Sequence, residues 1–408
     1  MIKDFTEYRN VVSDDVIANV FRKARMIYGR HIVNINSTYF GGGVAEMLTS
    51  LIPAINDVGI DTGWRILYGT PDFFGVTKKF HNALQGEELH MTDIKKSIYT
   101  KGNEYFSHYT HLYHDAVIIH DPQPLPLINY YKKDQPWIWR CHIDLSNPNE
   151  ELWGYLKEFL IRYDMMIVSH EDYKRPDLPI EQKIIHPAIN PLSSKNKDLT
   201  DEDIEKYLEK FNIPTDKPLI TQVSRFDKWK DPLGVVEIFK EVKKEVDCRL
   251  VLCGSMATDD PEGKEIYDKV RDATRELSDN GDVILITAEH NILVNILQRA
   301  SSVVIQKSLR EGFGLVVTEA LWKETPVVGS RVGGIPLQII DGETGYLLEP
   351  HDIEGMAEKV VYLLQNEDKR KEMGKKGREH VKKNFLITRL VEDYIDLINE
   401  VSGRRRSK

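Results

Sequence analysis

The stretch SLREGFGLVVTEAL at residues 308–321 carries two glutamates, Glu311 and Glu319, around a Gly-Phe-Gly turn. It follows the apolar run 302–308, which is typical of a buried strand, and it opens a helix. Helix starts leave backbone N–H groups unpaired, so bare amides at 313–316 are suited to an anion. A ligand with a phosphate for these amides and hydroxyls for the acids fits the stretch, as a sugar nucleotide does. The alternative assigns Glu319 to the helix dipole and Glu311 to solvent.

Apolar runs alternate with amphipathic stretches throughout the chain, and a polar segment at 191–207 interrupts the pattern. This predicts an α/β protein with two doubly wound, facing sheets, and with a ligand cleft lined by the loops that follow the strands. We expect one domain at 1–190 and another at 191–385, with a last helix near 388–402 packing back on the first. The runs are 31–37, 64–69, 115–121, 136–144 and 164–170, then 218–224, 248–255, 282–288, 302–308 and 326–330.

Composition excludes several classes of protein. The 408 residues carry a net charge of −9, which argues against a nucleic-acid partner. Three cysteines without C-x-x-C spacing fit a reducing interior. The charged N-terminus lacks a signal peptide's apolar run, and no stretch approaches the roughly 20 apolar residues of a membrane span. We therefore expect a cytoplasmic protein with small-molecule substrates and no membrane partner. Its oligomeric state stays open, with a homodimer among the alternatives.

Polar residues follow the predicted strands in both halves. Gly41-Gly42-Gly43 open a helix after 31–37, which favours an anion or sugar contact over a simple turn. Arg225 and Lys230 follow 218–224 and can converge on a pyrophosphate, with a solvated surface pair as an equal alternative. In the first half, two neighbouring strands end in groups suited to sugar hydroxyls: His120, Asp121 and Gln123, then His142 and Asp144.

Together these motifs carry a family resemblance. Arg225 and Lys230, followed by E-G-F-G-L-x-x-x-E at 311–319, resemble the retaining glycosyltransferases of family 4, which have two Rossmann-like domains in the GT-B arrangement. GGVAEMLTSLIP, VIIHDPQPLPL, WRCHIDLSNPN and HPAINPLSSKN resemble the archaeal trehalose glycosyltransferring synthases. The resemblance covers essentially the whole chain. It implies the GT-B fold with the active site in the cleft between the domains. It also implies reversible transfer of glucose from a nucleoside diphosphate glucose to free glucose, giving α,α-trehalose.

The resemblance also implies roles for individual residues. Arg225 and Lys230 would hold the diphosphate, and Glu311 and His142 would contact the transferred glucose. Glu319 would take the ribose hydroxyls, and the Gly42-Gly43 loop would close over the donor. The turn and helix start at Phe313, Gly314, Leu315 and Val316 would bind the sugar hydroxyls and the distal phosphate. Our candidates on the acceptor side are Asp121, Gln123 and Asp144.

We expect no required cofactor and no protein-bound metal, because Arg225 and Lys230 can replace a metal electrostatically. Mg²⁺ could assist on the diphosphate without a dedicated protein site. Same-face attack on the sugar is favoured over double displacement through Glu311, since the amide-rich turn beside that acid suits hydroxyl binding. Three alternatives remain: a family 4 enzyme with another acceptor, a sugar-nucleotide epimerase of the same fold, and a non-catalytic sensor. The sequence leaves open the nucleotide base and the physiological direction.

Overall fold

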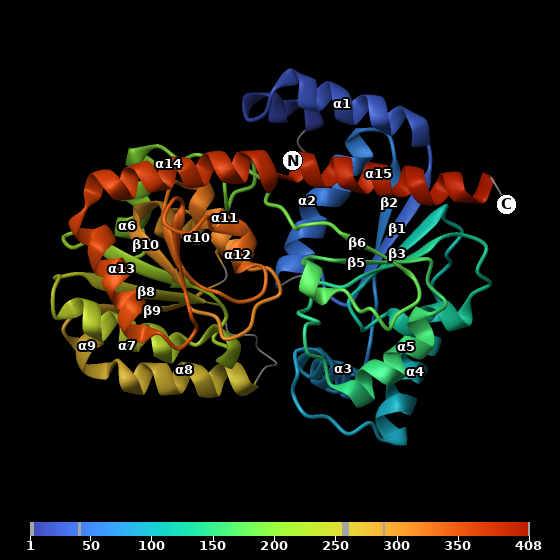
Figure 1. The fold of residues 1–408 in the computed structure, drawn as a ribbon, viewed down its shortest axis with the longest axis horizontal. Helices are drawn as coiled ribbons and strands as arrows, with labels where there is room; N and C mark the ends of the chain where they lie inside the picture. The colour runs from blue at the N-terminus through green and yellow to red at the C-terminus, as the bar shows by residue number, and fades with distance from the viewer. Residues whose placement is uncertain (1–3, 40–41, 255–260, 289, 407–408) are drawn as a thin grey trace. The chain divides into compact units, whose positions relative to one another are not determined.

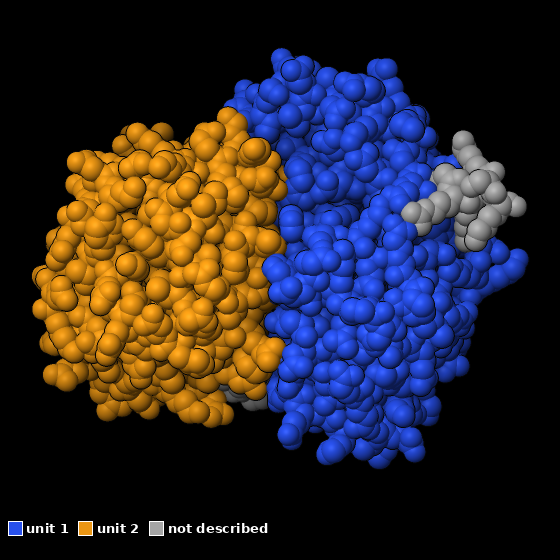
Figure 2. Space-filling view, in the orientation of Figure 1, with its two compact units in different colours: residues 1–188, 387–408 blue, residues 189–386 orange. Residues whose placement is uncertain are grey.

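The computed structural model describes residues 4–39, 42–254, 261–288 and 290–406. The chain divides into unit 1, residues 1–188 with 387–408, and unit 2, residues 189–386. Figure 2 colours the two units separately. Each unit contains one sheet of parallel strands with helices packed against it (Figure 1), so the predicted α/β architecture is confirmed. Within the described residues, no helix combines the length and apolar character needed to cross a membrane.

Unit 1 has its strands in the order β2-β1-β3-β4-β5-β6. Helix α15 returns to this unit and packs against α1 and α2 (Figure 1). The strands are β1 (His31–Asn36), β2 (Asp61–Ile66), β3 (Ala116–His120), β4 (Trp137–Arg140), β5 (Met165–Val168) and β6 (Glu181–Ile184). The α-helices are α1 (Asp14–Ala24), α2 (Gly43–Asp57), α3 (Pro71–Leu84), α4 (Asp93–Ser107), α5 (Glu150–Leu160) and α15 (Ile387–Arg406). The 3-10 helices are η1 (Phe5–Asn10), η2 (Arg25–Ile27), η3 (Leu125–Tyr130) and η4 (Glu171–Tyr173).

Unit 2 has its strands in the order β12-β11-β10-β7-β8-β9. The strands are β7 (Leu219–Val223), β8 (Arg249–Gly254), β9 (Val283–Thr287), β10 (Ser301–Gln306), β11 (Val327–Ser330) and β12 (Gly345–Leu348). The helices are α6 (Asp201–Lys210), η5 (Lys228–Lys230), α7 (Pro232–Lys243), α8 (Pro261–Ala273), α9 (Arg275–Asp279), α10 (Asn291–Ala300), α11 (Leu315–Trp322), α12 (Ile335–Gln338), α13 (Ile353–Gln365) and α14 (Glu367–Asn384).

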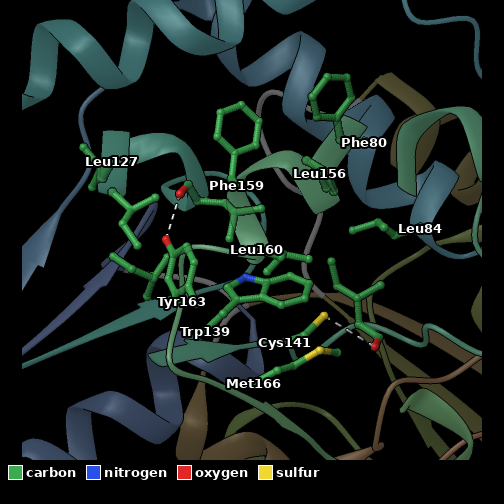
Figure 3. Close-up of a cluster of buried hydrophobic side chains, with 14 of the residues drawn as sticks. Phe80, Leu84, Leu127, Trp139, Cys141, Leu156, Phe159, Leu160, Tyr163 and Met166 are labelled. Atoms are coloured by element: carbon green, nitrogen blue, oxygen red, sulfur yellow. Dashed lines mark hydrogen bonds between the residues drawn. The ribbon is translucent and has the colours of Figure 1, made fainter. Parts of the chain in front are cut away.

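Alternation along the strands sends side chains to both faces of each sheet. In unit 2, Ile220 and Leu250 pack in one apolar cluster with α7 and α13, while Leu219 and Val251 pack in another with α10. In unit 1, Trp139, Cys141 and Met166 lie in one buried cluster with side chains of α3 and α5 (Figure 3). Burial raises the pKa of the Cys141 thiol well above its usual value, so this cysteine is an inert packing residue. The loops at the strand ends thus start from strands that are held in buried apolar clusters.

Candidate active site

In unit 2, Lys230 and Glu311 meet at one edge of the sheet. Lys230 precedes α7 in the loop after β7, and Glu311 lies in the loop after β10. Because β7 and β10 are parallel neighbours, their carboxyl ends lie at the same edge. The Lys230 Nζ atom lies 2.5 Å from Glu311 Oε2, and both side chains are largely buried. The two residues that the sequence singled out on separate loops therefore form one ion pair.

Glu311 is held by further donors and by the glycine turn beside it. Gln306 Nε2 and Ser308 Oγ lie 3.2 and 3.3 Å from the same Oε2 atom. Gly314 caps α11 with φ at 84°, and no side chain among the described residues bonds as a cap there. A Cβ at Gly314 would lie 3.2 Å from Glu311 Cγ, so the turn needs glycine both for its backbone and for space.

The turn itself is braced by Gln338, which sequence reasoning missed. The side-chain oxygen of Gln338 accepts from the Thr318 amide at 2.9 Å, and its Nε2 donates to the Phe313 carbonyl at 2.5 Å. One amide side chain thereby links Phe313 in the turn to Thr318 in α11, on either side of Leu315 and Val316. The start of α11 presents the positive end of the helix dipole beside the Lys230–Glu311 pair.

A second ion pair joins the same two loops with the charges reversed. Lys307 follows β10, is almost fully buried, and its Nζ contacts Asp231 Oδ2. Asp231 adopts φ at 44° and caps α7 by accepting from the Gly234 amide at 3.1 Å. Neither partner was predicted, although a lysine directly after an apolar strand run is a detectable signal. A buried lysine needs an anionic partner.

Arg225 differs from Lys230 in being open to solvent. Its side chain is 46% exposed, and its guanidinium lies 3.5 Å from Asp227 Oδ2. Asp227 also caps η5, accepting from the Trp229 amide at 2.7 Å. Arg225 is thus more open to an incoming anion at the end of β7 than Lys230, whose side chain is largely buried against Glu311.

Glu319 lies inside unit 2 rather than at its surface. The residue is 1% exposed, and Lys195 Nζ lies 2.9 Å from its Oε1 atom. Gln298 Nε2 lies 3.4 Å from the other oxygen. Lys195 comes from the polar segment at 191–207, to which the sequence pattern assigned no site residue. No local pattern connects it to Glu319.

In unit 1, His142 stacks on His120 at the ends of β4 and β3. The ring centroids are 5.3 Å apart with an 11° interplanar angle, and His120 Nδ1 lies 3.0 Å from His142 Nε2. The other nitrogen of His120 lies 2.9 Å from Asn34 Oδ1. Burial, together with the Arg140 guanidinium, lowers the pKa of His120 to about 3 and that of His142 well below its usual value. Both rings are therefore neutral near pH 7.

The acceptor-side candidates have distinct local contacts. Asp121 adopts φ at 61° and its Oδ1 accepts from the His142 amide at 2.8 Å; burial raises its pKa to about 7. Gln123 Oε1 is buried and has no hydrogen-bond partner within the described part of the chain. Asp144 Oδ1 accepts from the amide and hydroxyl of Ser146 at 2.9 and 2.6 Å. Asp121 thus orients the backbone of His142, whereas Asp144 is engaged in a local turn.

The glycine loop after β1 is described only in part. Gly41 lies outside the described residues. Gly42 caps α2 with φ at 83°, and a Cβ there would meet no described atom within 4 Å. Gly43 begins α2. Among the described atoms, none fills the space beside Gly42 at this helix start.

Comparison with known proteins agrees with this architecture. Residues 34–175 match the family model for the trehalose synthase N-terminal domain, and residues 203–380 match the model for glycosyl transferases group 1. A solved α,α-trehalose-phosphate synthase (UDP-forming) from Burkholderia vietnamiensis superposes with a TM-score of 0.72 at 15% identity, covering 93% of this chain and 98% of that one. The fold is accordingly that of the GT-B glycosyltransferases.

Two curated relatives identify the family within the glycosyltransferases. The trehalose synthase of Thermococcus litoralis is 46% identical over 404 residues, which span 97% of both chains. The trehalose phosphorylase of Pleurotus pulmonarius is 30% identical over 435 residues, which span 93% of this chain and 59% of the relative. The chain belongs to the trehalose synthase family of glycosyltransferases.

Proposed function

We propose that this chain transfers glucose from a nucleoside diphosphate glucose to free glucose, giving α,α-trehalose and the nucleoside diphosphate in a reversible reaction. The trehalose synthases among its relatives support the sugar chemistry. The observation that carries the donor assignment is the Lys230–Glu311 pair beside the start of α11. Three groups lie together at this place: a cation that can bind phosphate, a carboxylate that can bind sugar hydroxyls, and a helix start that can bind an anion.

The cations stabilise the leaving nucleotide. Arg225 supplies a planar guanidinium group that is open to solvent, and Lys230 supplies a compact ammonium charge in a site shielded from water. Negative charge grows on the diphosphate as its bond to the sugar breaks, so both contacts strengthen toward the transition state. These cations take the electrostatic role that a metal has elsewhere, and no resident metal forms part of the proposal. Mg²⁺ carried by the diphosphate would add to this stabilisation.

Other residues bind and orient the sugars and the nucleotide. Glu311 and the amides at the start of α11 hold the transferred glucose and the distal phosphate, and Glu319 holds the ribose. The backbone at Gly42 and Gly43 covers the donor. His142, neutral and held by His120, contacts the transferred glucose, while Asp121, Gln123 and Asp144 are assigned to the acceptor.

The transfer keeps the configuration at the anomeric carbon. The bond from C1 to the diphosphate oxygen breaks, and the acceptor oxygen bonds to C1 on the same face. The departing phosphate oxygen takes the acceptor's proton. Glu311 Oε2 has three donors, Lys230, Gln306 and Ser308, which reduce its strength as a nucleophile. This supports same-face attack over a covalent intermediate on Glu311.

The proposal is tested by omitting the acceptor. Wild-type protein is incubated with uridine, adenosine or guanosine diphosphate glucose, with and without glucose, and products are separated by chromatography. We expect trehalose only when glucose is present. A new sugar nucleotide formed without glucose would indicate an epimerase. In a parallel incubation with trehalose and phosphate in place of the sugar nucleotide, formation of glucose 1-phosphate would indicate a phosphorylase. Transfer to another sugar but not to glucose would indicate a different acceptor, and binding without turnover a sensor.

A further inference from the structure

The backbone around Lys195 is fixed against α10 and α11. Asn295 Nδ2 donates to the carbonyls of Ser194 and Lys197 at 3.1 and 2.9 Å. Trp322 Nε1 donates to the carbonyl of Asn196 at 3.0 Å. These bonds hold the chain on both sides of Lys195, so its side chain starts from a defined place. Such support is typical of a residue whose position matters.

Lys195 and Glu319 form a buried ion pair in this frame. Lys195 is 13% exposed at its side chain, Glu319 is 1% exposed, and the Nζ–Oε1 distance is 2.9 Å. A buried carboxylate without a partner would take up a proton or leave the interior. The pair therefore supplies the buried Glu319 carboxylate with a counter-charge and holds it in one orientation.

A second lysine orders the neighbouring groups. Lys323 Nζ donates to Asn196 Oδ1 at 2.8 Å, to Gln298 Oε1 at 2.7 Å and to the Glu319 carbonyl at 3.1 Å. Gln298 is thereby oriented with its Nε2 toward Glu319 Oε2. The carboxylate is thus supported by Lys195 at one oxygen and by an oriented amide at the other.

We propose that Lys195 is a positioning residue that holds Glu319 for the ribose of the donor nucleotide and thereby sets the discrimination between ribose and deoxyribose. The inference rests on the proposed function, which gives Glu319 the ribose hydroxyls. A carboxylate oriented in this way accepts from both hydroxyls of ribose. When one hydroxyl is missing, a buried acceptor loses its partner, which is the situation in which a protein discriminates most strongly.

The test compares dissociation constants for a nucleoside diphosphate and its 2′-deoxy and 3′-deoxy forms. The base is whichever of uridine, adenosine and guanosine diphosphate the wild type binds most tightly. We expect Lys195→Met to reduce the preference for ribose about tenfold, the size of one charge-assisted hydrogen bond. Glu319→Gln should reduce it similarly, and the double variant should lose no more than the stronger single variant. Lys195→Arg keeps the charge and should retain most of the preference.

The matched control is Lys197→Met, which changes an exposed lysine two residues along the same segment and should leave the preference unchanged. The ratio of two constants from one preparation is insensitive to a loss of folded protein. An unchanged ratio in Lys195→Met, additive losses in the double variant, or an equal loss in Lys197→Met would contradict the inference. So would a wild type that does not discriminate. A wild type that discriminates but makes no trehalose contradicts the proposed function alone.

Discussion

Glu311 lies in the loop before α11 and Glu319 lies eight residues later within that helix, and the two acids have different partners. Glu311 pairs with Lys230 beside the proposed diphosphate site, and Glu319 pairs with Lys195 inside unit 2. If Glu319 binds the ribose hydroxyls, this contact is the same in the ground state and in the transition state. Glu319→Ala should therefore mainly weaken binding of the product nucleoside diphosphate. Glu311→Ala should leave that affinity almost unchanged while turnover falls. Titration calorimetry and initial rates check both; equal, small effects would remove the carboxylates from the site.

Substitution of Arg225 or Lys230 should lower the turnover number. Replacing either by alanine removes one contact that strengthens as the nucleotide leaves, which costs on the order of 3 kcal/mol, or about a hundredfold in kcat. Lys228→Ala changes a neighbouring cation that lies over the Trp229 ring, and it serves as the control with near-normal turnover. Folded Arg225→Ala and Lys230→Ala variants with normal kcat would show that the diphosphate assignment is wrong.

Asp121 should make the stability of the protein depend on pH. Burial raises its pKa to about 7 in the folded state, whereas the unfolded chain has the ordinary value of 3.8. Between these values the folded state holds the extra proton, so this group's contribution to stability is full below pH 3.8 and is lost as pH rises toward 7. The slope is at most about 1.4 kcal/mol per pH unit. Asp121→Asn should remove it.

Urea unfolding of the wild type and Asp121→Asn at intervals from pH 4 to 7 measures this difference. The wild type should lose stability relative to the variant as pH rises. Taking the difference cancels carboxylates whose pKa values are lowered, such as Asp115 and Asp198, because they contribute equally to both proteins. A difference that does not change with pH would contradict the assignment.

At the scale of elements, two oppositely oriented ion pairs tie the loop after β7 to the loop after β10. Lys230 reaches Glu311 in one direction, and Lys307 reaches Asp231 in the other. The second pair fixes the start of α7, and Lys230 directly precedes its cap residue, Asp231. Each loop contributes one lysine and one carboxylate to the two ion pairs, and the pairs hold the loops together. The ammonium of Lys230 is therefore held in place for a ligand.

Lys307→Met should destabilise the protein by about 2–3 kcal/mol, because it leaves the Asp231 carboxylate with less compensation in a partly buried place. Adding Asp231→Asn removes that charge and should recover more than half of the loss. The midpoints of urea unfolding provide the measurement. Equal losses in the single and the double variant would show that packing of the lysine stem, rather than charge, carries the stability.

The elements that sequence reasoning missed share one property. β6 and β12 were not predicted, and β2 was placed at 64–69 rather than Asp61–Ile66. All three are edge strands, and none is buried along its whole length, so they lack the continuous apolar run that marks an interior strand. The interior strands β3, β5, β7 and β8 were predicted to within one or two residues of their observed bounds.

Across the whole molecule, a candidate site residue can be predicted when its own neighbours in the sequence mark its position, and not when it depends on a contact with a distant residue. Arg225, Lys230 and Glu311 could be predicted as candidates because each follows an apolar run, and the structure places each of them after a strand. Lys195, Lys307 and Gln338 were missed because each acts on a residue far along the chain. Lys195 is 124 positions before Glu319, and no periodicity encodes such a pair. The same holds for Asn34, which orders His120 from another strand.

The proposed reaction requires transfer of an intact glucosyl group. The most direct measurement follows nucleoside diphosphate glucose labelled with ¹³C at the anomeric carbon, incubated with unlabelled glucose and the wild-type protein, by NMR. We expect the label at an α-configured anomeric carbon of trehalose, with one nucleoside diphosphate released per trehalose formed. Label in free glucose, in glucose 1-phosphate or in a β-linked disaccharide, or an unchanged donor, would contradict it.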